Sequence, residues 1–309
     1  MRNLILSTFM CAGLLLTATG KAQTQTSGTR NLADLFDGER AFVDLVKQVE
    51  AGPRLPDHPG LDFTRNLIRT TLTENGFDVH TQPFETTSPL LMKQVKGENI
   101  FGVYPKGATV KYIISAHYDT RPYADMDPDP SKRMLPVPGA NDGASGVAAL
   151  LELSRAIPQA TPPHGIALVF FDVEDHGGKG DEMGFCLGSR YFASNLPTQV
   201  QGFQHGINLD MIARDGMTLP MEGYSLSKAP RLTFDLWNAG SSLHPDVWLK
   251  TRGPSIYDDH MPFLALKMSY IDVIDFEYAP WHTTGDTPDK CSAQSLDIVG
   301  DTILQFIQN

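Results

Sequence analysis

The stretch that decides the fold is Ile166-Ala-Leu-Val-Phe-Phe171, which Asp172-Val-Glu174-Asp175-His176-Gly177-Gly178 follows directly. Six consecutive apolar residues predict a β-strand buried on both faces, as in a parallel sheet. The run ends in carboxylates and a histidine, and buried carboxylates need a cation, a metal or several hydrogen-bond donors. Open α/β sheets bind ligands at the carboxyl ends of their strands. An ordinary acidic turn would explain this strand end taken alone, so the rest of the chain has to decide.

The first 22 residues have the pattern of a cleavable export signal. Arg2 gives a positive start, residues 4–17 are mostly apolar, and Gly20-Lys-Ala22 supplies small residues at cleavage-type positions. The apolar stretch is too short for a good membrane span. Cys11 would suggest a lipoprotein, but bulky residues precede it. We therefore expect removal of residues 1–22 and an exported, soluble protein, periplasmic or secreted.

The rest of the chain is expected to form one domain. Removing 22 of the 309 residues also removes Arg2 and Lys21, so the formal net charge falls from −11 to −13. This charge argues against nucleic acid or an anionic membrane as a partner. No linker interrupts the chain, so we expect a flexible segment over residues 23–38 and a catalytic domain over 39–309. Cys186 and Cys291 could pair or remain as buried thiols, and the sequence leaves both open.

Helices and strands are predicted to alternate along the domain. The predicted helices cover 39–50, 61–75, 143–157, 189–195, 230–241 and 293–307, and the predicted strands cover 77–84, 98–104, 110–116, 166–171, 206–209, 246–249 and 268–274. This alternation predicts a three-layer α/β fold, with a central, mostly parallel twisted sheet and helices on both faces. Residues 118–141 form a long polar loop, and such loops are usually functional. Its Asp125–Asp129 segment begins like a calcium loop, but the prolines favour a solvated turn.

Ligand-type side chains fall at the ends of several predicted strands. His117, Asp175 and Asp210 each follow an apolar strand, Asp142 opens a helix, and His282 follows the last strand. Parallel strands would bring them to one edge of the sheet. Carboxylate oxygens and imidazole nitrogens without a thiolate suit a catalytic zinc site. Each residue alone has a structural explanation, such as helix capping, and their coincidence at several strand ends favours a metal site.

These residues carry a family resemblance. The chain resembles the zinc aminopeptidase superfamily at the following positions, in chain order: His117-Tyr-Asp119, Asn141-Asp142-Gly-Ala-Ser-Gly146, Glu174-Asp175, Asp210 and His282. Within that superfamily, the chain resembles the glutaminyl cyclases of the animal-type zinc branch in three segments: Tyr257-Asp258-Asp259-His260-Met-Pro-Phe263, Trp281-His282-Thr283 and Gly52-Pro-Arg-Leu-Pro56. The resemblance spans residues 40–309.

The resemblance implies one zinc ion per chain, held by Asp142, Asp175 and His282. The family normally has Glu at the position of Asp175, so this ligand has a shorter arm. His117 matches a residue that binds metal in the aminopeptidases. In a cyclase the resemblance implies that this residue does not bind the zinc but lies near the substrate.

Further roles are implied for the residues around the zinc. Glu174 matches the general base and acid, and Asp210 and Asp258 match acids that share hydrogen bonds with it. Neighbouring carboxylates would raise the pKa of Glu174, as proton shuttling requires. Trp281 matches the aromatic residue that orients the substrate. Phe185 lies where the family often has another aromatic residue. This side chain could form a wall of the substrate pocket or belong to the hydrophobic core.

The implied reaction converts the N-terminal Gln of peptides or proteins to pyroglutamate and releases ammonia. We expect such peptides as substrates, no membrane insertion after processing, and a monomer. Two alternatives stay open: a di-zinc aminopeptidase, and a non-enzymatic binding module on the same fold. The presence of Glu174 and of all three metal ligands argues against the non-enzymatic binding module. Three arginines could face the pocket, but surface salt bridges are expected for each of them: Arg121, Arg190 and Arg214.

Overall fold

The computed structural model describes Met1 and residues 32–309. The predicted signal peptide and most of the predicted flexible segment therefore lie outside the described residues. Within the described part, no helix has both the length and the apolar character needed to cross a membrane.

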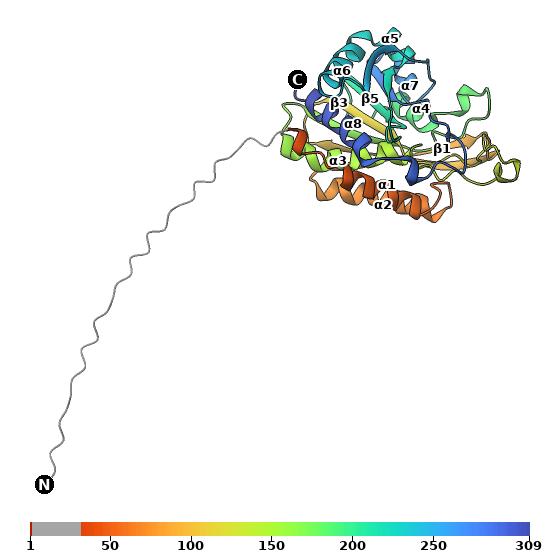
Figure 1. The fold of residues 1–309 in the computed structure, drawn as a ribbon, viewed down its shortest axis with the longest axis horizontal. Coiled ribbons are helices and arrows are strands. Elements are labelled where there is room, and N and C mark those ends of the chain that lie inside the picture. The colour runs from red at the N-terminus through yellow and green to blue at the C-terminus, as the bar shows by residue number, and fades with distance from the viewer. Residues whose placement is uncertain (2–31) are drawn as a thin grey trace. The chain divides into compact units, whose positions relative to one another are not determined.

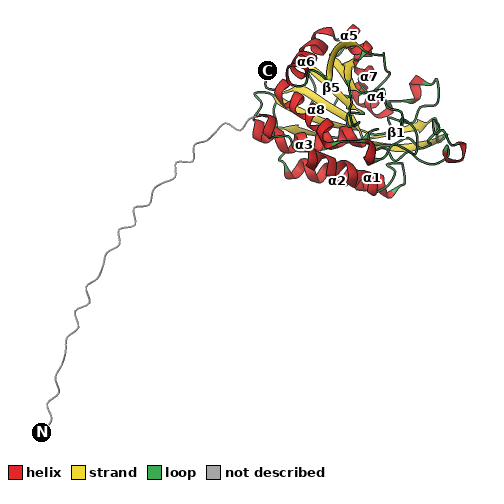
Figure 2. Ribbon diagram, viewed as in Figure 1, coloured by secondary structure: helices red, strands yellow, loops and turns green. Residues whose placement is uncertain are grey.

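A sheet forms the centre of the domain, with helices around it (Figure 2). It has six strands in the order β1-β2-β4-β3-β5-β8. The strands are β1 (Asp78–Ser88), β2 (Lys93–Tyr104), β3 (Val110–His117), β4 (Gly165–Phe171), β5 (His205–Asp210) and β8 (Tyr270–Ile274). Strands β4, β3, β5 and β8 are mutually parallel, whereas β1 and β2 form an antiparallel hairpin at one edge. The predicted mostly parallel sheet is confirmed.

Helices cover both faces of this sheet, as the prediction of three layers requires (Figure 1). One face carries α1 (Gly38–Glu50), α2 (Pro59–Glu74), α3 (Ala144–Ala160) and α8 (Ala293–Phe306), and the other carries α4 (Leu187–Ser194) and α7 (Met261–Ala265). All seven residues of β4 are buried. Alternate residues of β4 enter the two layers: Ile166, Leu168 and Phe170 face the larger cluster, and Ala167, Val169 and Phe171 face the smaller one. The uninterrupted apolar run is thus explained by burial on both sides.

The domain begins earlier along the chain than the sequence predicts. Leu32–Asp34 forms a short 3-10 helix, and Leu35 and Phe36 are buried in the main core. Gly300 of α8 makes room for the Phe36 ring, because a Cβ at that position would collide with it. The expectation of a loosely ordered segment is therefore wrong for residues 35–38. Two apolar residues within a polar stretch were too few to predict that this segment packs into the core.

A second, two-stranded sheet lies beside the end of β8. It consists of β6 (Leu219–Met221) and β7 (Trp248–Arg252), and α5 (Gly223–Lys228) and α6 (Pro230–Leu243) accompany it. The strand predicted over 246–249 belongs to this sheet rather than to the central one. One strand and two α-helices of the described residues were not predicted, namely β6, α5 and α7, and each is six residues or shorter. Elements of this length contain too few residues to establish a period.

A buried carboxylate anchors the start of α5. Glu222 accepts hydrogen bonds from the backbone amides of Tyr224, Ser225 and Ile256 at 2.7, 2.6 and 2.9 Å. The His260 Nε2 atom lies 3.3 Å from the same carboxylate. Burial opposes ionisation, but His260 and these amides lower the pKa of Glu222 to about 2.

Replacement of this acid should destabilise the protein in a pH-dependent way. A folded-state pKa below the unfolded one contributes stability above the unfolded pKa, and this contribution is lost as the pH falls from about 4.5 toward 2. Glu222→Gln should therefore lower the free energy of unfolding by on the order of 3 kcal/mol at pH 7 and by clearly less near pH 3. Urea denaturation at both pH values measures this, with Glu74→Gln on the exposed side of α2 as control. Equal losses at both pH values would contradict the assignment.

Candidate active site

A cavity lies at the edge of the sheet where β3, β4, β5 and β8 end. It is lined by Asp142, Glu174, Asp175, Phe185, Asp210, Met211, Ile256, Tyr257, Asp258, Ile274, Phe276, Trp281 and His282. Every residue predicted at a catalytic, metal-binding or substrate-binding position is in this lining except His117. Parallel strands bring their carboxyl ends to the same edge, so residues far apart in sequence meet here.

Three of the lining residues have the geometry of a metal site. The His282 Nε2 atom lies 3.2 Å from Asp175 Oδ1 and 3.7 Å from Asp142 Oδ2. One donor atom from each residue falls within 4.8 Å of the others. Ligands of a tetrahedral zinc ion, each about 2.0–2.1 Å from the metal, are roughly 3.3–3.4 Å apart. Asp175 Oδ2 is buried without a hydrogen-bond partner among the described residues. The trio therefore fits zinc, and its nitrogen and oxygen donors match that metal.

Two buried carboxylates hold the backbone from which these ligands project. Asp119 accepts the amides of Glu174 and Asp175 at 2.9 and 3.1 Å. Asp286 accepts the amide of Asp142 at 3.1 Å and that of its predecessor Asn141 at 2.9 Å. Sequence reasoning missed both roles. Asp119 stood inside a quoted motif without an assigned function, and Asp286 had no motif around it.

The backbone is also strained at this edge. Val173, Met211 and His282 have φ angles of 57°, 46° and 56°, in the left-handed region that non-glycine residues rarely adopt. Each of these positions costs on the order of 1–3 kcal/mol and persists only where the surroundings enforce it. Val173 directly precedes Glu174, and Met211 directly follows Asp210. Strain thus coincides with the functional side chains.

Arg121 corrects the expectation of a surface salt bridge. The residue is only 2% exposed, and its Nη1 atom donates to Asp175 Oδ1 at 2.8 Å. Its other nitrogens donate to Asp125 at 2.7 and 2.8 Å, and its guanidinium lies 5.5 Å from the centre of the Phe185 ring. Although burial opposes it, the charges of His282 and Arg121 lower the pKa of Asp175. Asp175 therefore stays ionised, as a metal ligand must.

The other two arginines are partly exposed, in better agreement with the expectation. Arg190 donates to the Tyr257 hydroxyl at 3.0 Å, and Arg214 forms an ion pair with Asp275.

The long loop over residues 118–141 packs against the segment that carries His282. The amide of Met126 donates to the carbonyl of His282 at 3.2 Å. Asp127 accepts from the amide and the hydroxyl of Thr284 at 2.9 and 2.6 Å. With Asp125 paired to Arg121, these acids serve local structure, which agrees with a turn rather than a calcium loop.

A second group of buried acids surrounds Glu174. Donor atoms of Glu174, Cys186, Asp258 and Asp259 lie within 4.8 Å of one another, and the Cys186 thiol donates to Glu174 Oε1 at 3.2 Å. Burial, followed by the charges of Asp175, Asp259 and Asp258, raises the pKa of Glu174 well above its usual value. Burial and the charge of Asp210 raise the pKa of Asp258 to about 7. Asp259 was quoted in a motif but was not predicted to act.

The two cysteines that the sequence left open are both free and buried, so they do not form a disulfide.

His117 lies behind the cavity rather than in its lining. It is fully buried, with Nε2 at 3.1 Å from Asp142 Oδ1 and 3.3 Å from Asp210 Oδ1. Gly143 permits this packing, because a Cβ there would lie 2.5 Å from His117 Nε2. The substrate contact predicted for His117 therefore has no support in this geometry. The three residues form a second trio with donor atoms within 4.8 Å, and Asp142 belongs to both trios.

Aromatic side chains form part of the cavity wall. The Trp281 ring stacks on His282 with centroids 3.6 Å apart and an interplanar angle of 24°. The Phe276 ring lies 5.1 Å from that of Trp281. Phe185 is half-buried and lines the cavity, which favours its predicted place as a pocket wall.

Comparison with known proteins places this arrangement in a family. The sequence pattern of "Peptidase family M28" matches residues 99–307, which include all the candidate site residues. The chain belongs to peptidase family M28. Its fold is similar to that of a glutaminyl cyclase from Bacteroides thetaiotaomicron bound to N-acetylhistamine, with a TM-score of 0.84 and 35% identity over 89% of this chain and 98% of that one.

Two further structures share this similarity. One is a glutaminyl cyclase from Porphyromonas gingivalis, with a TM-score of 0.84 and 32% identity over 88% of this chain and 98% of that one. The other is a zinc-dependent exopeptidase from Parabacteroides distasonis, with a TM-score of 0.84 and 31% identity over 89% and 98%. The resemblance to bacterial glutaminyl cyclases within the M28 family is thus confirmed. These relatives support a zinc-dependent enzyme that acts on peptides.

The Asp119 anchor makes a testable contribution. Asp119→Asn keeps the shape of the side chain but leaves one acceptor oxygen for two backbone amides. We expect a loss of about 1–3 kcal/mol in the free energy of unfolding and a zinc affinity lowered about 10- to 100-fold. Competition with a chelator and urea denaturation measure the two effects. The control is Asp62→Asn on the exposed face of α2. Unchanged zinc affinity would show that the anchor does not position the ligands.

Proposed function

We propose that this protein is a glutaminyl-peptide cyclotransferase that converts N-terminal Gln to pyroglutamate. The observation that carries the proposal is the position of Asp258, which is buried beside Glu174 and Asp210. A peptidase needs a base that activates water. A cyclase instead needs an acid that passes one proton between two nitrogens, and extra buried carboxylates favour that behaviour.

One zinc ion per chain is proposed, with Asp142, Asp175 and His282 as its ligands. When bound, zinc would polarise the γ-carbonyl of the substrate Gln and stabilise the oxyanion that develops there. Arg121 donates to Asp175 Oδ1, the oxygen that also lies 3.2 Å from His282 Nε2, so the side chain of this ligand is oriented before the metal binds.

Glu174 is proposed to move the proton. The α-amine of the substrate attacks its own γ-carbon, a new C–N bond forms, and the bond to the γ-nitrogen breaks. Glu174 takes the proton from the attacking amine and returns it to the departing nitrogen, which leaves as ammonia. The raised pKa of Glu174 suits both transfers. The nucleophile is tethered to its target, so correct positioning supplies much of the acceleration.

The aromatic wall would position the substrate and limit water. Trp281 covers His282, and Phe276 extends the same wall. Phe185 faces the cavity from the loop that follows Asp175. Exclusion of water matters for a cyclase, because water would compete with the amine as nucleophile.

One observation favours a second candidate, a di-zinc aminopeptidase. His117, Asp142 and Asp210 have donor atoms 3.1 and 3.3 Å apart, which also suits ligands of one metal ion. Asp142 could then bridge two ions. Asp258 argues against this candidate, because a proton shared between Asp258 and Asp210 would leave Asp210 less able to bind a second cation.

The remaining assignments complete the proposal. We propose that residues 1–22 are removed on export, that residues 39–309 contain the whole catalytic machinery, and that the enzyme acts as a monomer on exported peptides.

Activity on Gln-initiated peptides tests the proposal directly. The zinc-loaded protein should release ammonia from such peptides and lower their mass accordingly. Glu174→Gln should keep the fold and the zinc but reduce turnover about 100-fold or more, because the proton shuttle is removed. Mass spectrometry, an ammonia assay and zinc analysis measure these outcomes. The proposal fails if the wild-type protein leaves Gln peptides intact while it removes N-terminal residues from other peptides.

The metal content separates the two candidates. We expect about one tightly bound zinc per chain after dialysis. His117→Asn should keep this ion, because His117 is not in the proposed ligand set, whereas Asp175→Asn should lose it. Atomic absorption, with circular dichroism to confirm folding, measures both. Two zinc ions in the wild type and one in His117→Asn would identify the di-zinc alternative.

A further inference from the structure

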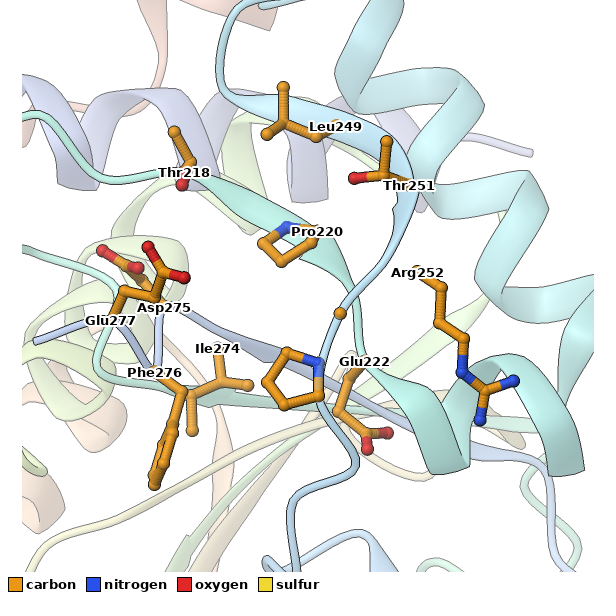
Figure 3. Close-up of a pocket in the computed structure, with 12 residues that line it drawn as sticks. Thr218, Pro220, Glu222, Leu249, Thr251, Arg252, Ile274, Asp275, Phe276 and Glu277 are labelled. Carbon is orange, nitrogen blue, oxygen red and sulfur yellow. The ribbon is translucent and has the colours of Figure 1, made fainter.

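A second cavity of about 310 Å³ lies between the β6–β7 sheet and the segment that follows β8 (Figure 3). Its lining combines apolar and charged side chains: Pro220, Leu249, Arg252, Phe276, Asp275 and Glu277. None of the reaction steps proposed above uses it.

This cavity adjoins the candidate active site, and the two cavities share a wall. Ile274 and Phe276 line both of them. The Phe276 ring also lies against Trp281, 5.1 Å between centroids, so the wall that holds the substrate Gln is also the wall of the second cavity. A peptide that leaves the active site across Phe276 enters this space.

Charges are separated across the cavity. Figure 3 shows Asp275 and Glu277 together on one side and Arg252 on the opposite side. Asp275 is already paired with Arg214, and the Glu222 carboxylate accepts three backbone amides. Glu277 and Arg252 are exposed, and neither takes part in any ion pair among the described residues. Glu277 is therefore the acid available to a ligand.

We propose that this cavity binds the part of the substrate that follows the N-terminal Gln, and that Glu277 selects a lysine or arginine there. This inference rests on the proposed cyclotransferase function. Lysine and arginine have long apolar stems that pack on apolar surfaces while the charge stays in water. Pro220, Leu249 and Phe276 offer such a surface. The formal net charge of −11 also attracts cationic peptides to the enzyme.

The arrangement predicts which residue of the substrate Glu277 contacts. Glu277 follows Phe276 directly in the chain, so the acid lies beside the shared wall and Arg252 lies beyond it. An extended peptide advances about 3.3–3.6 Å per residue. Because the two cavities share Phe276, we expect a cationic side chain within the first three residues after Gln to reach Glu277.

A scan of peptide substrates tests this assignment. Uncharged Gln-initiated pentapeptides carry a single Lys moved from position 2 to position 5, and a Gln-Ala dipeptide serves as a substrate too short to enter the cavity. In the wild type, Lys at one position among 2–4 should raise kcat/KM about two- to fivefold over Ala, the range expected for an exposed ion pair. High salt should reduce this preference.

Variants connect the preference to the cavity. Glu277→Lys should abolish or reverse the preference and leave kcat/KM for Gln-Ala unchanged. The matched control Glu74→Lys, also an exposed acid exchanged for lysine, should keep the preference. Thr251→Trp, which fills the cavity from β7, should lower kcat/KM for pentapeptides but not for Gln-Ala.

The outcomes separate this inference from the proposed function. Equal kcat/KM for all Lys positions, or a preference that persists in Glu277→Lys, overturns the inference while turnover of Gln-Ala upholds the proposed function. No turnover of any Gln substrate by the wild type overturns the proposed function and this inference with it.

Discussion

The two hydrogen bonds that the Asp119 carboxylate accepts from the amides of Glu174 and Asp175 are the interaction on which the site depends. They join the end of β3 to the turn after β4, so the two central strands deliver their side chains to one place. Although burial opposes it, His117, His176 and these amides keep the pKa of Asp119 low. This ionised acceptor is one of the groups that hold the turn at Val173 in its strained conformation, together with the hydrogen bonds that Val173 makes to Asp172 and Leu187.

Asp286 repeats the same solution on the other side of the cavity. Its two oxygens accept the amides of Asn141 and Asp142, and the Tyr278 hydroxyl donates to one of them at 2.7 Å. Main-chain anchors thus set the positions of both proposed carboxylate ligands from outside the cavity. The aromatic residues of the cavity wall, including Trp281 and Phe276, take no part in this anchoring. In the proposed enzyme, ligand geometry and substrate preference would therefore be controlled by different residues.

The sequence predicted the elements whose pattern is long or chemically distinctive. The apolar run of β4 identified the centre of the sheet, and His or Asp at strand ends identified the lining of the cavity. Residues that act by accepting backbone amides were missed, because an isolated Asp119 or Asp286 has no periodicity and no required spacing. Arg121 was misplaced for a related reason: its burial comes from packing beneath Phe185, which depends on a loop of irregular structure. The second cavity joins segments near residues 220, 250 and 275, and only the tertiary fold brings these together.

The left-handed backbone at Val173, Met211 and His282 has an evolutionary consequence. Glycine adopts this conformation without the steric penalty that a side chain brings, and valine suits it least because it branches at Cβ. A chain under selection for folding alone would gain by placing glycine at exposed positions of this kind. In this domain these three strained positions lie beside the proposed catalytic and metal-binding residues instead. A descendant that kept the fold but lost catalysis could replace these residues with glycine or adopt an unstrained backbone there. Non-glycine residues at these three positions therefore indicate that the chemistry is still under selection.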